Sequence, residues 1–124
     1  MTREQKELLL KDLCARIPYK TKINVDDIGL FIPRLKYIDG ITCHFYECAW
    51  TKFIDEIKPY LRPMSSMSDE EREEEGKLWD IVTTTRNDLH YLYTDFLVSH
   101  HLDYRGLIPM GLALEAPEDM YNDD

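Results

Sequence analysis

Mainly apolar residues recur at helical spacing along residues 77–101, the longest periodic segment of the chain. They stand alternately four and three positions apart, at Leu78, Val82, Thr85, Leu89, Leu92 and Phe96. This spacing places the side chains on one stripe of an α-helix, so we predict a helical segment over Lys77–His101. The run Thr83–Thr85 allows a break within it, because β-branched residues lower helix propensity.

An N-terminal helix is predicted over Arg3–Arg16, where leucines form an apolar stripe. Thr2 precedes the helix and Gln5 stands three positions later, which is the spacing of a capping box. Pro18 ends the helix, because the residue before a proline is driven away from helical backbone angles.

Two further helical segments are predicted in the middle of the chain. Thr51–Ile57 has apolar residues at the spacing of a short helix or helical turn. A second capping box at Ser68–Glu71 predicts a helix that runs through Glu75. Gly76 either ends this helix or is tolerated within it at a cost of about 1 kcal/mol.

Alternating polar and apolar residues predict strands at Lys20–Val25, Gly29–Ile38 and Ile41–Ala49. Pro33 restricts the second strand to an edge position or a bulge, because proline donates no hydrogen bond to a sheet. The dipeptide Asp39-Gly40 is typical of a two-residue hairpin turn. We therefore expect a meander of about three antiparallel strands.

These elements predict a small α+β fold, in which the antiparallel sheet packs against the N-terminal helix and the long C-terminal helical segment. Residues 1–114 form a single domain in this prediction, and the acidic residues 115–124 form a frayed tail. The expected core on the helices is Leu8, Leu9, Leu13, Leu78, Leu89, Leu92 and Phe96.

The net charge of −9 is unevenly distributed. Residues 1–36 carry 8 Lys and Arg against 5 Asp and Glu, whereas residues 37–124 carry 7 against 19. An acidic body repels phosphate backbones, so binding of nucleic acid through a basic patch is not expected. No segment concentrates basic residues among aromatic ones, as a single-strand binder requires. Imitation of nucleic acid by the acidic surface remains a weaker alternative.

The pattern of cysteines, glycines and apolar runs predicts a cytoplasmic protein without a cofactor. Cys14, Cys43 and Cys48 give no disulfide framework, and neither a signal peptide nor an apolar run of membrane-spanning length is present. Cysteine and histidine spacing does not match a zinc site. The glycines form no phosphate-binding loop. We therefore expect neither a metal nor a membrane partner.

The run Phe96–Pro117 contains the residues that best suit a functional site. His100 or His101 could pair with Asp103 as an oriented base in a small hydrolase or transferase, although no nucleophile motif accompanies them. A histidine at a helix C-terminus also stabilises the helix dipole, and Asp103 to Gly106 suits an ordered turn. Tyr and Arg dominate interface energetics, which favours a protein-recognition surface. The candidate surface is Tyr60, Arg62, His100, His101, Asp103, Tyr104 and Arg105.

Three blocks of sequence, LLLKDLCARIP, IKPYLRPMSSMS and FLVSHHLDYRGLIPMGLALEAP, together resemble a group of small proteins from gut Bacteroidetes and their phages and prophages. The group has no established activity, so the resemblance assigns no functional residue. It implies a bacterial or phage origin, residence in the cytoplasm and an accessory role such as phage–host interaction. Together with the missing catalytic constellation, this predicts a non-enzymatic protein-binding module whose partner is another protein. The sequence leaves the oligomeric state open.

Overall fold

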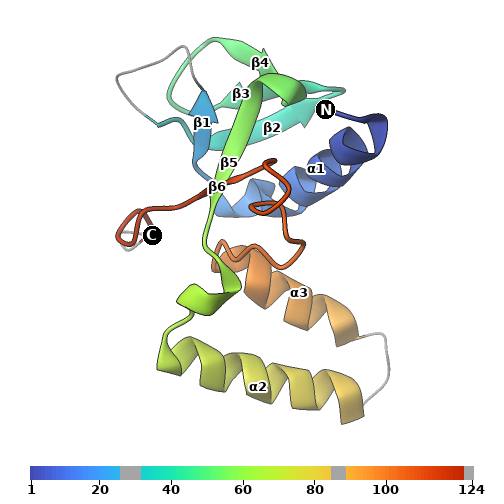
Figure 1. Ribbon diagram of the computed structural model, residues 1–124, viewed down its shortest axis with the longest axis vertical. Coiled ribbons are helices and arrows are strands. Elements are labelled where there is room, and N and C mark those ends of the chain that lie inside the picture. The colour runs from blue at the N-terminus through green and yellow to red at the C-terminus, as the bar shows by residue number, and fades with distance from the viewer. Residues whose placement is uncertain (26–31, 85–88, 122–124) are drawn as a thin grey trace.

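The computed structural model describes residues 1–25, 32–84 and 89–121, and within them it confirms an α+β fold. Figure 1 shows helix α1 and the strands at one end of the molecule, and helices α2 and α3 at the other. The helices are α1 (Arg3–Arg16), α2 (Asp69–Thr84) and α3 (His90–Ser99), with short 3₁₀ turns at Ile17–Tyr19, Ile54–Glu56 and Met64–Ser66. The strands are β1 (Ile23–Val25), β2 (Leu35–Asp39), β3 (Thr42–Phe45), β4 (Thr51–Phe53), β5 (Ile57–Leu61) and β6 (Leu114–Glu115).

Helix α1 begins and ends where its sequence predicts. The Gln5 amide donates to the Thr2 hydroxyl at 3.1 Å, and the Thr2 amide donates to the Gln5 side chain at 2.9 Å. This reciprocal pair is the predicted capping box, and it satisfies backbone donors that the first helical turn leaves unpaired. Leu9 and Leu13 are fully buried on the helix face that packs against the sheets.

The described strands form two sheets, β1-β5-β6 and β2-β3-β4. The second is an antiparallel meander of three strands, but β4 takes the place of the first predicted strand in it, and β1 belongs to the other sheet. Strand β1 pairs antiparallel with β5, which lies more than thirty residues further along the chain. Two backbone hydrogen bonds still connect the first predicted strand to the second. The Ile23 amide donates to the Pro33 carbonyl and the Leu35 amide donates to the Thr21 carbonyl, both at 2.9 Å. Residues 29–31 of the second predicted strand lie outside the described residues.

The β2–β3 hairpin is confirmed, but its loop is shifted by one residue. Asp39 pairs with Thr42, so Gly40 and Ile41 form the loop in place of Asp39 and Gly40. Gly40 takes a φ of 64°, which glycine adopts at no steric cost. The register shifts between Leu35 and Tyr37, and this irregularity follows Pro33 within a few residues.

Thr51–Ile57 is not a helix, apart from the 3₁₀ turn at Ile54–Glu56. Its first residues form strand β4, which pairs with β3, and Ile57 begins β5. The apolar spacing of this segment instead reflects two buried residues, Ile54 and Ile57, on either side of a tight turn. A three-residue strand offers too short a pattern to be distinguished from a helical turn by periodicity.

The periodic segment Lys77–His101 is two helices and not one. Helix α2 starts after the predicted capping box of Ser68 and Glu71, passes through Gly76 without a break and reaches Thr84. Helix α3 begins at His90 and packs beside α2 (Figure 1). The predicted break at Thr83–Thr85 is near the end of α2, and Thr85 itself lies outside the described residues.

The buried residues gather in two clusters. The larger one joins α1, both sheets and the segment around Leu107. The smaller one lies between the 3₁₀ turn at Met64–Ser66 and helices α2 and α3. Members of the smaller cluster are Phe96, Leu97 and Leu102, with Met64, Met67, Leu78, Tyr93 and Tyr104 packed against them. Leu92 was predicted to join the core and is instead 36% exposed.

The C-terminal segment is anchored as far as Tyr121, whereas the sequence predicts fraying from residue 115. Strand β6 pairs in parallel with β5, and the Ala116 amide donates to the Leu61 carbonyl at 2.7 Å. The Tyr121 hydroxyl donates to the Tyr60 carbonyl at 2.7 Å and accepts from the Lys22 amide at 3.0 Å. The segment therefore closes over the first sheet.

Candidate functional site

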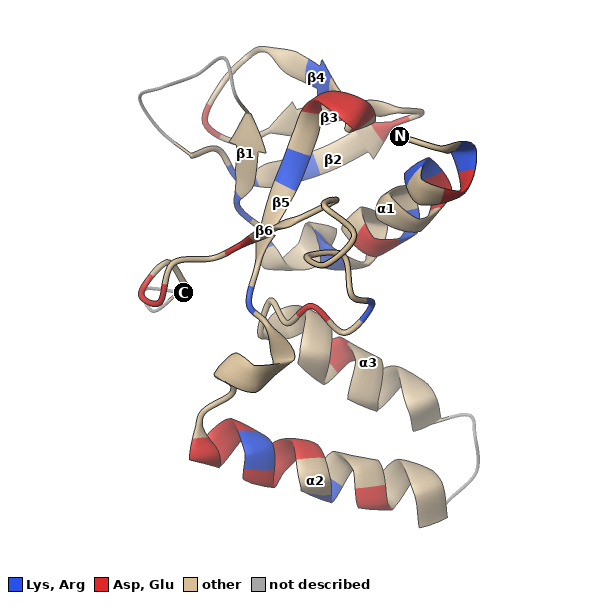
Figure 2. Ribbon diagram, viewed as in Figure 1, with Lys and Arg blue, Asp and Glu red and all other residues tan. Residues whose placement is uncertain are grey.

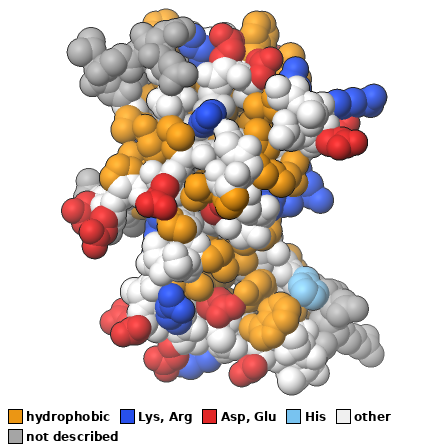
Figure 3. Space-filling model, in the orientation of Figure 1, with side chains coloured by type: hydrophobic (Ala, Val, Ile, Leu, Met, Phe, Trp, Pro, Cys, Tyr) orange, Lys and Arg blue, Asp and Glu red, His pale blue; other side chains and the backbone are white. Residues whose placement is uncertain are grey.

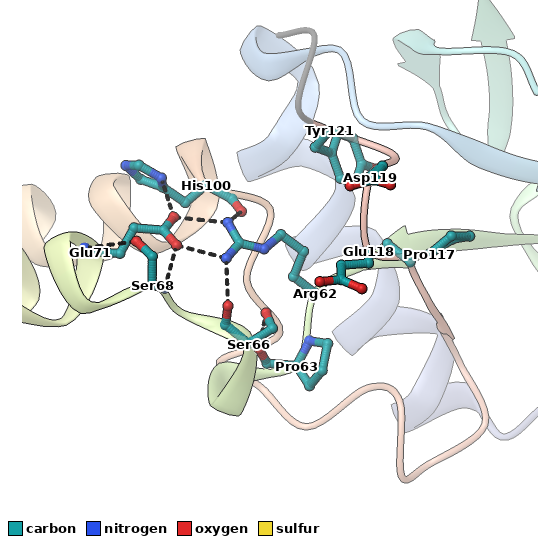
Figure 4. A pocket seen from close by; sticks show the side chains of 11 residues that line it. Arg62, Pro63, Ser66, Ser68, Glu71, His100, Pro117, Glu118, Asp119 and Tyr121 are labelled. Carbon is teal, nitrogen blue, oxygen red and sulfur yellow. Dashed lines mark hydrogen bonds and ion pairs between the residues drawn. The ribbon is translucent and has the colours of Figure 1, made fainter.

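Arg62, Glu71 and His100 form one hydrogen-bonded hub at the junction of the two ends of the molecule (Figure 4). The Arg62 guanidinium binds both Glu71 carboxylate oxygens, at 2.8 and 2.7 Å, and His100 Nδ1 lies 2.8 Å from Glu71 Oε2. The hydrogen bonds from Arg62 lower the pKa of Glu71 from 4.5 to about 2, against the opposing effect of burial. The hub therefore contains an ionised carboxylate that is already neutralised by arginine.

A cavity of about 480 Å³ adjoins this hub and is closed on its other side by residues 116–119 and Tyr121. Arg62 directs its terminal nitrogens at Glu71 and at the carbonyls of His100 and Ser66, at 3.2 and 3.0 Å. Figure 4 shows Glu118, Asp119 and Tyr121 on the side of the arginine away from Glu71. Because both terminal nitrogens of Arg62 are bound to acceptors of the protein, the hub joins β5 to the helices and is poorly suited to capture an anion.

His101 and Tyr60 meet through Tyr121 and not through a polar contact with each other. The His101 ring stacks on Tyr121 with 3.6 Å between centroids, and the Tyr60 carbonyl accepts from the Tyr121 hydroxyl. Burial, and then the positive charges of Arg16 and Arg62, lower the pKa of His101 from 6.5 to about 4. His101 is therefore neutral at physiological pH, and its Nδ1 has no hydrogen-bond partner among the described residues.

The free energy of unfolding is expected to fall as the pH drops from about 6.5 to about 4, because of His101. Between those values the unfolded chain binds a proton that the folded chain excludes, so acid favours unfolding with a slope of up to about 1.4 kcal/mol per pH unit. Urea unfolding of the wild type and of His101→Phe, measured across this range, tests the effect. The variant should lose the slope.

Glu71 affects the free energy of unfolding mainly below pH 4.5, so its effect can be separated from that of His101. Its folded pKa of about 2 lies below its ordinary 4.5, so its contribution is present above pH 4.5 and is lost as the pH falls toward 2. An unchanged slope above pH 4.5 in His101→Phe would contradict the assignment to His101.

Asp103, Tyr104 and Arg105 hold the chain together after α3. The Asp103 carboxylate accepts from the amides of Leu107 and Ile108, at 2.8 and 2.9 Å. Arg105 donates to Asp12 of α1 at 3.1 Å and lies over the Tyr104 ring at 4.8 Å. The hydrolase or transferase alternative requires Asp103 to orient a histidine, but Asp103 is occupied by these backbone amides and His100 is bound by Glu71.

The outer face of the second sheet carries an aromatic group that the sequence reasoning missed. Tyr37 of β2 and His44 of β3 are cross-strand partners whose rings stack, with 4.1 Å between the ring centroids and an angle of 10° between the ring planes. Phe53 of β4 pairs with Thr42, two residues before His44, and so lies on the same face. The opposite face carries Leu35, Cys43 and Phe45 into the core. Strand alternation could have found this face, had β4 been recognised as a strand.

Three cations surround Tyr46 at one end of that face, although no single segment of the sequence concentrates basic residues among aromatic ones. Lys20, Lys36 and Arg34 lie 5.4, 5.7 and 5.9 Å from the ring centroid. Lys20 and Tyr46 stand 26 positions apart, so no sequence window contains the cluster as a compact motif.

No family model, curated protein or solved structure matches the chain. Among the described residues, no helix has both the length and the apolar character that a membrane crossing requires. The same residues contain no group of three or more His, Cys, Asp and Glu side chains arranged to hold a metal ion. The function must therefore be inferred from the arrangement of the side chains.

Proposed function

We propose that this chain is a non-enzymatic protein-binding module of the cytoplasm, of bacterial or phage origin, and that the outer face of the β2-β3-β4 sheet contacts its partner. The stacked pair Tyr37 and His44, together with Phe53, forms the centre of this surface. Cys14, Cys43 and Cys48 are free thiols, which suits a reducing compartment.

The exposure of large aromatic side chains on a two-faced sheet carries the proposal. Tyr37 is 46% exposed and Phe53 is 53% exposed, whereas Cys43 and Phe45 of the intervening strand β3 are buried on the opposite face. Ile41 in the hairpin loop and Trp50 before β4 add exposed apolar area at 55% and 46%. Neighbouring exposed apolar residues of this kind mark interaction surfaces in soluble proteins, and Tyr and Trp are enriched among the residues that dominate binding energy.

The proposal moves the binding surface away from the residues that the sequence favoured. Arg62 and His100 are bound to Glu71, and Arg105 is bound to Asp12. Asp103 accepts backbone amides, and both His101 and Tyr104 are largely enclosed. Substitution of these residues is expected to change stability first, whereas substitution of Tyr37 and Phe53 leaves the core intact.

The double variant Tyr37→Ser/Phe53→Ser is expected to lose at least about tenfold in affinity for the partner, which corresponds to about 1.4 kcal/mol. The immobilised chain is incubated with lysate of the bacterium that encodes it or serves as phage host. Any protein that the wild type retains and the double variant loses is purified and titrated against both.

The matched control is Tyr91→Ser/Leu92→Ser, which removes exposed apolar area from α3, where Tyr91 is 64% and Leu92 is 36% exposed. This control should bind as the wild type does. If no protein depends on Tyr37 and Phe53 for its retention, or if the α3 control loses the same protein, the sheet face is not the binding surface.

A further inference from the structure

We propose that the Tyr46 end of the outer sheet face recognises a carboxylate-rich segment of the partner protein. This inference rests on the proposed protein-binding function, because the Tyr46 cluster and the aromatic pair lie on the same face. The cluster is defined here as Lys20, Arg34, Lys36 and Tyr46.

Backbone geometry explains why these four side chains converge. The Tyr46 amide donates to the Arg34 carbonyl at 3.1 Å, which sets the two residues opposite each other. The register shift between Leu35 and Tyr37 interrupts the alternation of β2 at Lys36, which is exposed. Lys20 takes a φ of 53° at the end of the first 3₁₀ turn and is also exposed. The three cations thus approach one ring from two separate segments.

Within residues 1–25, 32–84 and 89–121, three cations gather at the cluster and the carboxylate of Glu47 is paired with one of them. Arg34 binds Glu47, with 2.5 Å between Nε and Oε1, and this pair balances one of the three cations. Lys20 and Lys36 instead lie over the face of Tyr46, within the distance at which a cation is attracted to an aromatic ring. Like charges gathered around one ring repel each other, so an anionic group bound there relieves the repulsion and gains two attractive contacts.

Charge distribution over the whole molecule favours an acidic protein segment over a nucleic acid. Figure 2 shows the acidic residues of α2 at the end of the molecule away from the β2-β3-β4 sheet. Figure 3 shows acidic side chains over that end and also at separate places on the strand end. A nucleic acid requires a basic track along several phosphates. The cluster surrounds a single ring, and Asp39 lies further along the same strand. A short run of Asp or Glu beside an apolar residue fits this small basic end and the adjoining Tyr37 and His44.

The test is selection of a displayed library of random short peptides on the wild type and on three variants. Lys20→Glu/Lys36→Glu reverses the cluster, and Lys11→Glu/Lys77→Glu makes the same change of net charge at exposed positions on α1 and α2. Tyr37→Ser/Phe53→Ser removes the aromatic surface. Circular dichroism melts establish that each variant is folded before selection.

The wild type and the helix variant are expected to enrich peptides that combine Asp or Glu with an apolar residue. An enriched peptide should bind the cluster variant at least about tenfold more weakly, and its affinity for the wild type should fall as salt is added. Two results would overturn this inference and leave the protein-binding function standing. The first is enrichment of peptides that need Tyr37 and Phe53 but contain no acidic residue, and the second is equal binding of an enriched peptide to the wild type and the cluster variant. No enrichment that depends on Tyr37 and Phe53 would overturn both.

Two further measurements separate other occupants of the cluster. Oligo(dT) that binds the wild type more tightly than the enriched peptide, and loses that binding in the cluster variant, would assign the cluster to nucleic acid. Self-association in sedimentation equilibrium that Lys20→Glu/Lys36→Glu abolishes would assign it to a second copy of this chain. Either result would overturn the inference.

Discussion

Replacing Asp12 with asparagine is expected to lower the free energy of unfolding by about 3–5 kcal/mol, the usual cost of removing one partner from a buried ion pair. Asp12 and Arg16 have side chains that are 0% exposed, and the two groups are joined by bonds of 2.7 and 3.1 Å. Asp12 also binds Arg105 at 3.1 Å. The substitution therefore leaves one fully buried and one largely buried guanidinium without their counter-ion.

The Asp12 carboxylate also helps to connect α1 to the segment after α3. Arg16 donates to the Leu102 carbonyl at 2.7 Å, and Leu102 belongs to the smaller hydrophobic cluster beside the helices. Arg105 approaches the same carboxylate from the segment after α3. Loss of the charge should therefore loosen the connection between the two ends of the molecule as well as destabilise α1.

Helix α1 also contains a second ion pair that serves as the control for this measurement. Arg3 and Glu7 form an ion pair with the same four-residue spacing, but their side chains are 92% and 66% exposed. Exposed pairs contribute little because water and salt screen them, so Glu7→Gln should leave the urea midpoint nearly unchanged. Equal losses of stability in Asp12→Asn and Glu7→Gln would show that burial of the pair does not determine its contribution.

Features that depend on neighbouring residues could be predicted from the sequence. The capping boxes at Thr2 and Ser68 and the hairpin between β2 and β3 are confirmed, because each is set by hydrogen bonds or turn preferences within a few positions. The bounds of α1 follow from the same short-range signals. These interactions leave a spacing in the sequence that a local pattern can detect.

The pairings that organise the fold join distant residues and leave no such spacing. Strand β5 pairs with β1 on one side and with β6 on the other. Strand β6 contains only two residues, too few for any alternation to be visible. The order of strands in a sheet is decided by which buried faces fit together, and for this chain that choice depended on contacts across most of its length.

The candidate site was mislocated for a related reason. Histidine, aspartate and arginine serve catalysis and recognition, but the same side chains also satisfy backbone groups at turns and helix ends. Asp103 receives two amides and Arg62 reaches two carbonyls in addition to Glu71. The run after α3 therefore consists largely of connecting contacts. The Tyr46 cluster escaped notice because its members come from separate segments.

Leu9→Ala is expected to cost about 2–5 kcal/mol of unfolding free energy, whereas Leu92→Ala should cost less than about 1 kcal/mol. Both leucines were predicted to lie in the core, but Leu9 is 0% exposed and Leu92 is 36% exposed. The stripe that predicts Leu92 assumes one straight helix from Lys77 to His101. Phe96, four positions further along the same stripe, is buried as predicted, and Leu97 beside it is buried too.

Urea unfolding of the two alanine variants tests this difference with the same chemical change at both positions. The cavity left at Leu9 lies among the close-packed residues of the larger cluster, so the loss combines transfer free energy with an unfilled volume. At Leu92 water already contacts the side chain and no cavity forms. A loss at Leu92 as large as that at Leu9 would mean that residues 77–101 pack as the continuous stripe predicts, and that the paired arrangement of α2 and α3 is wrong.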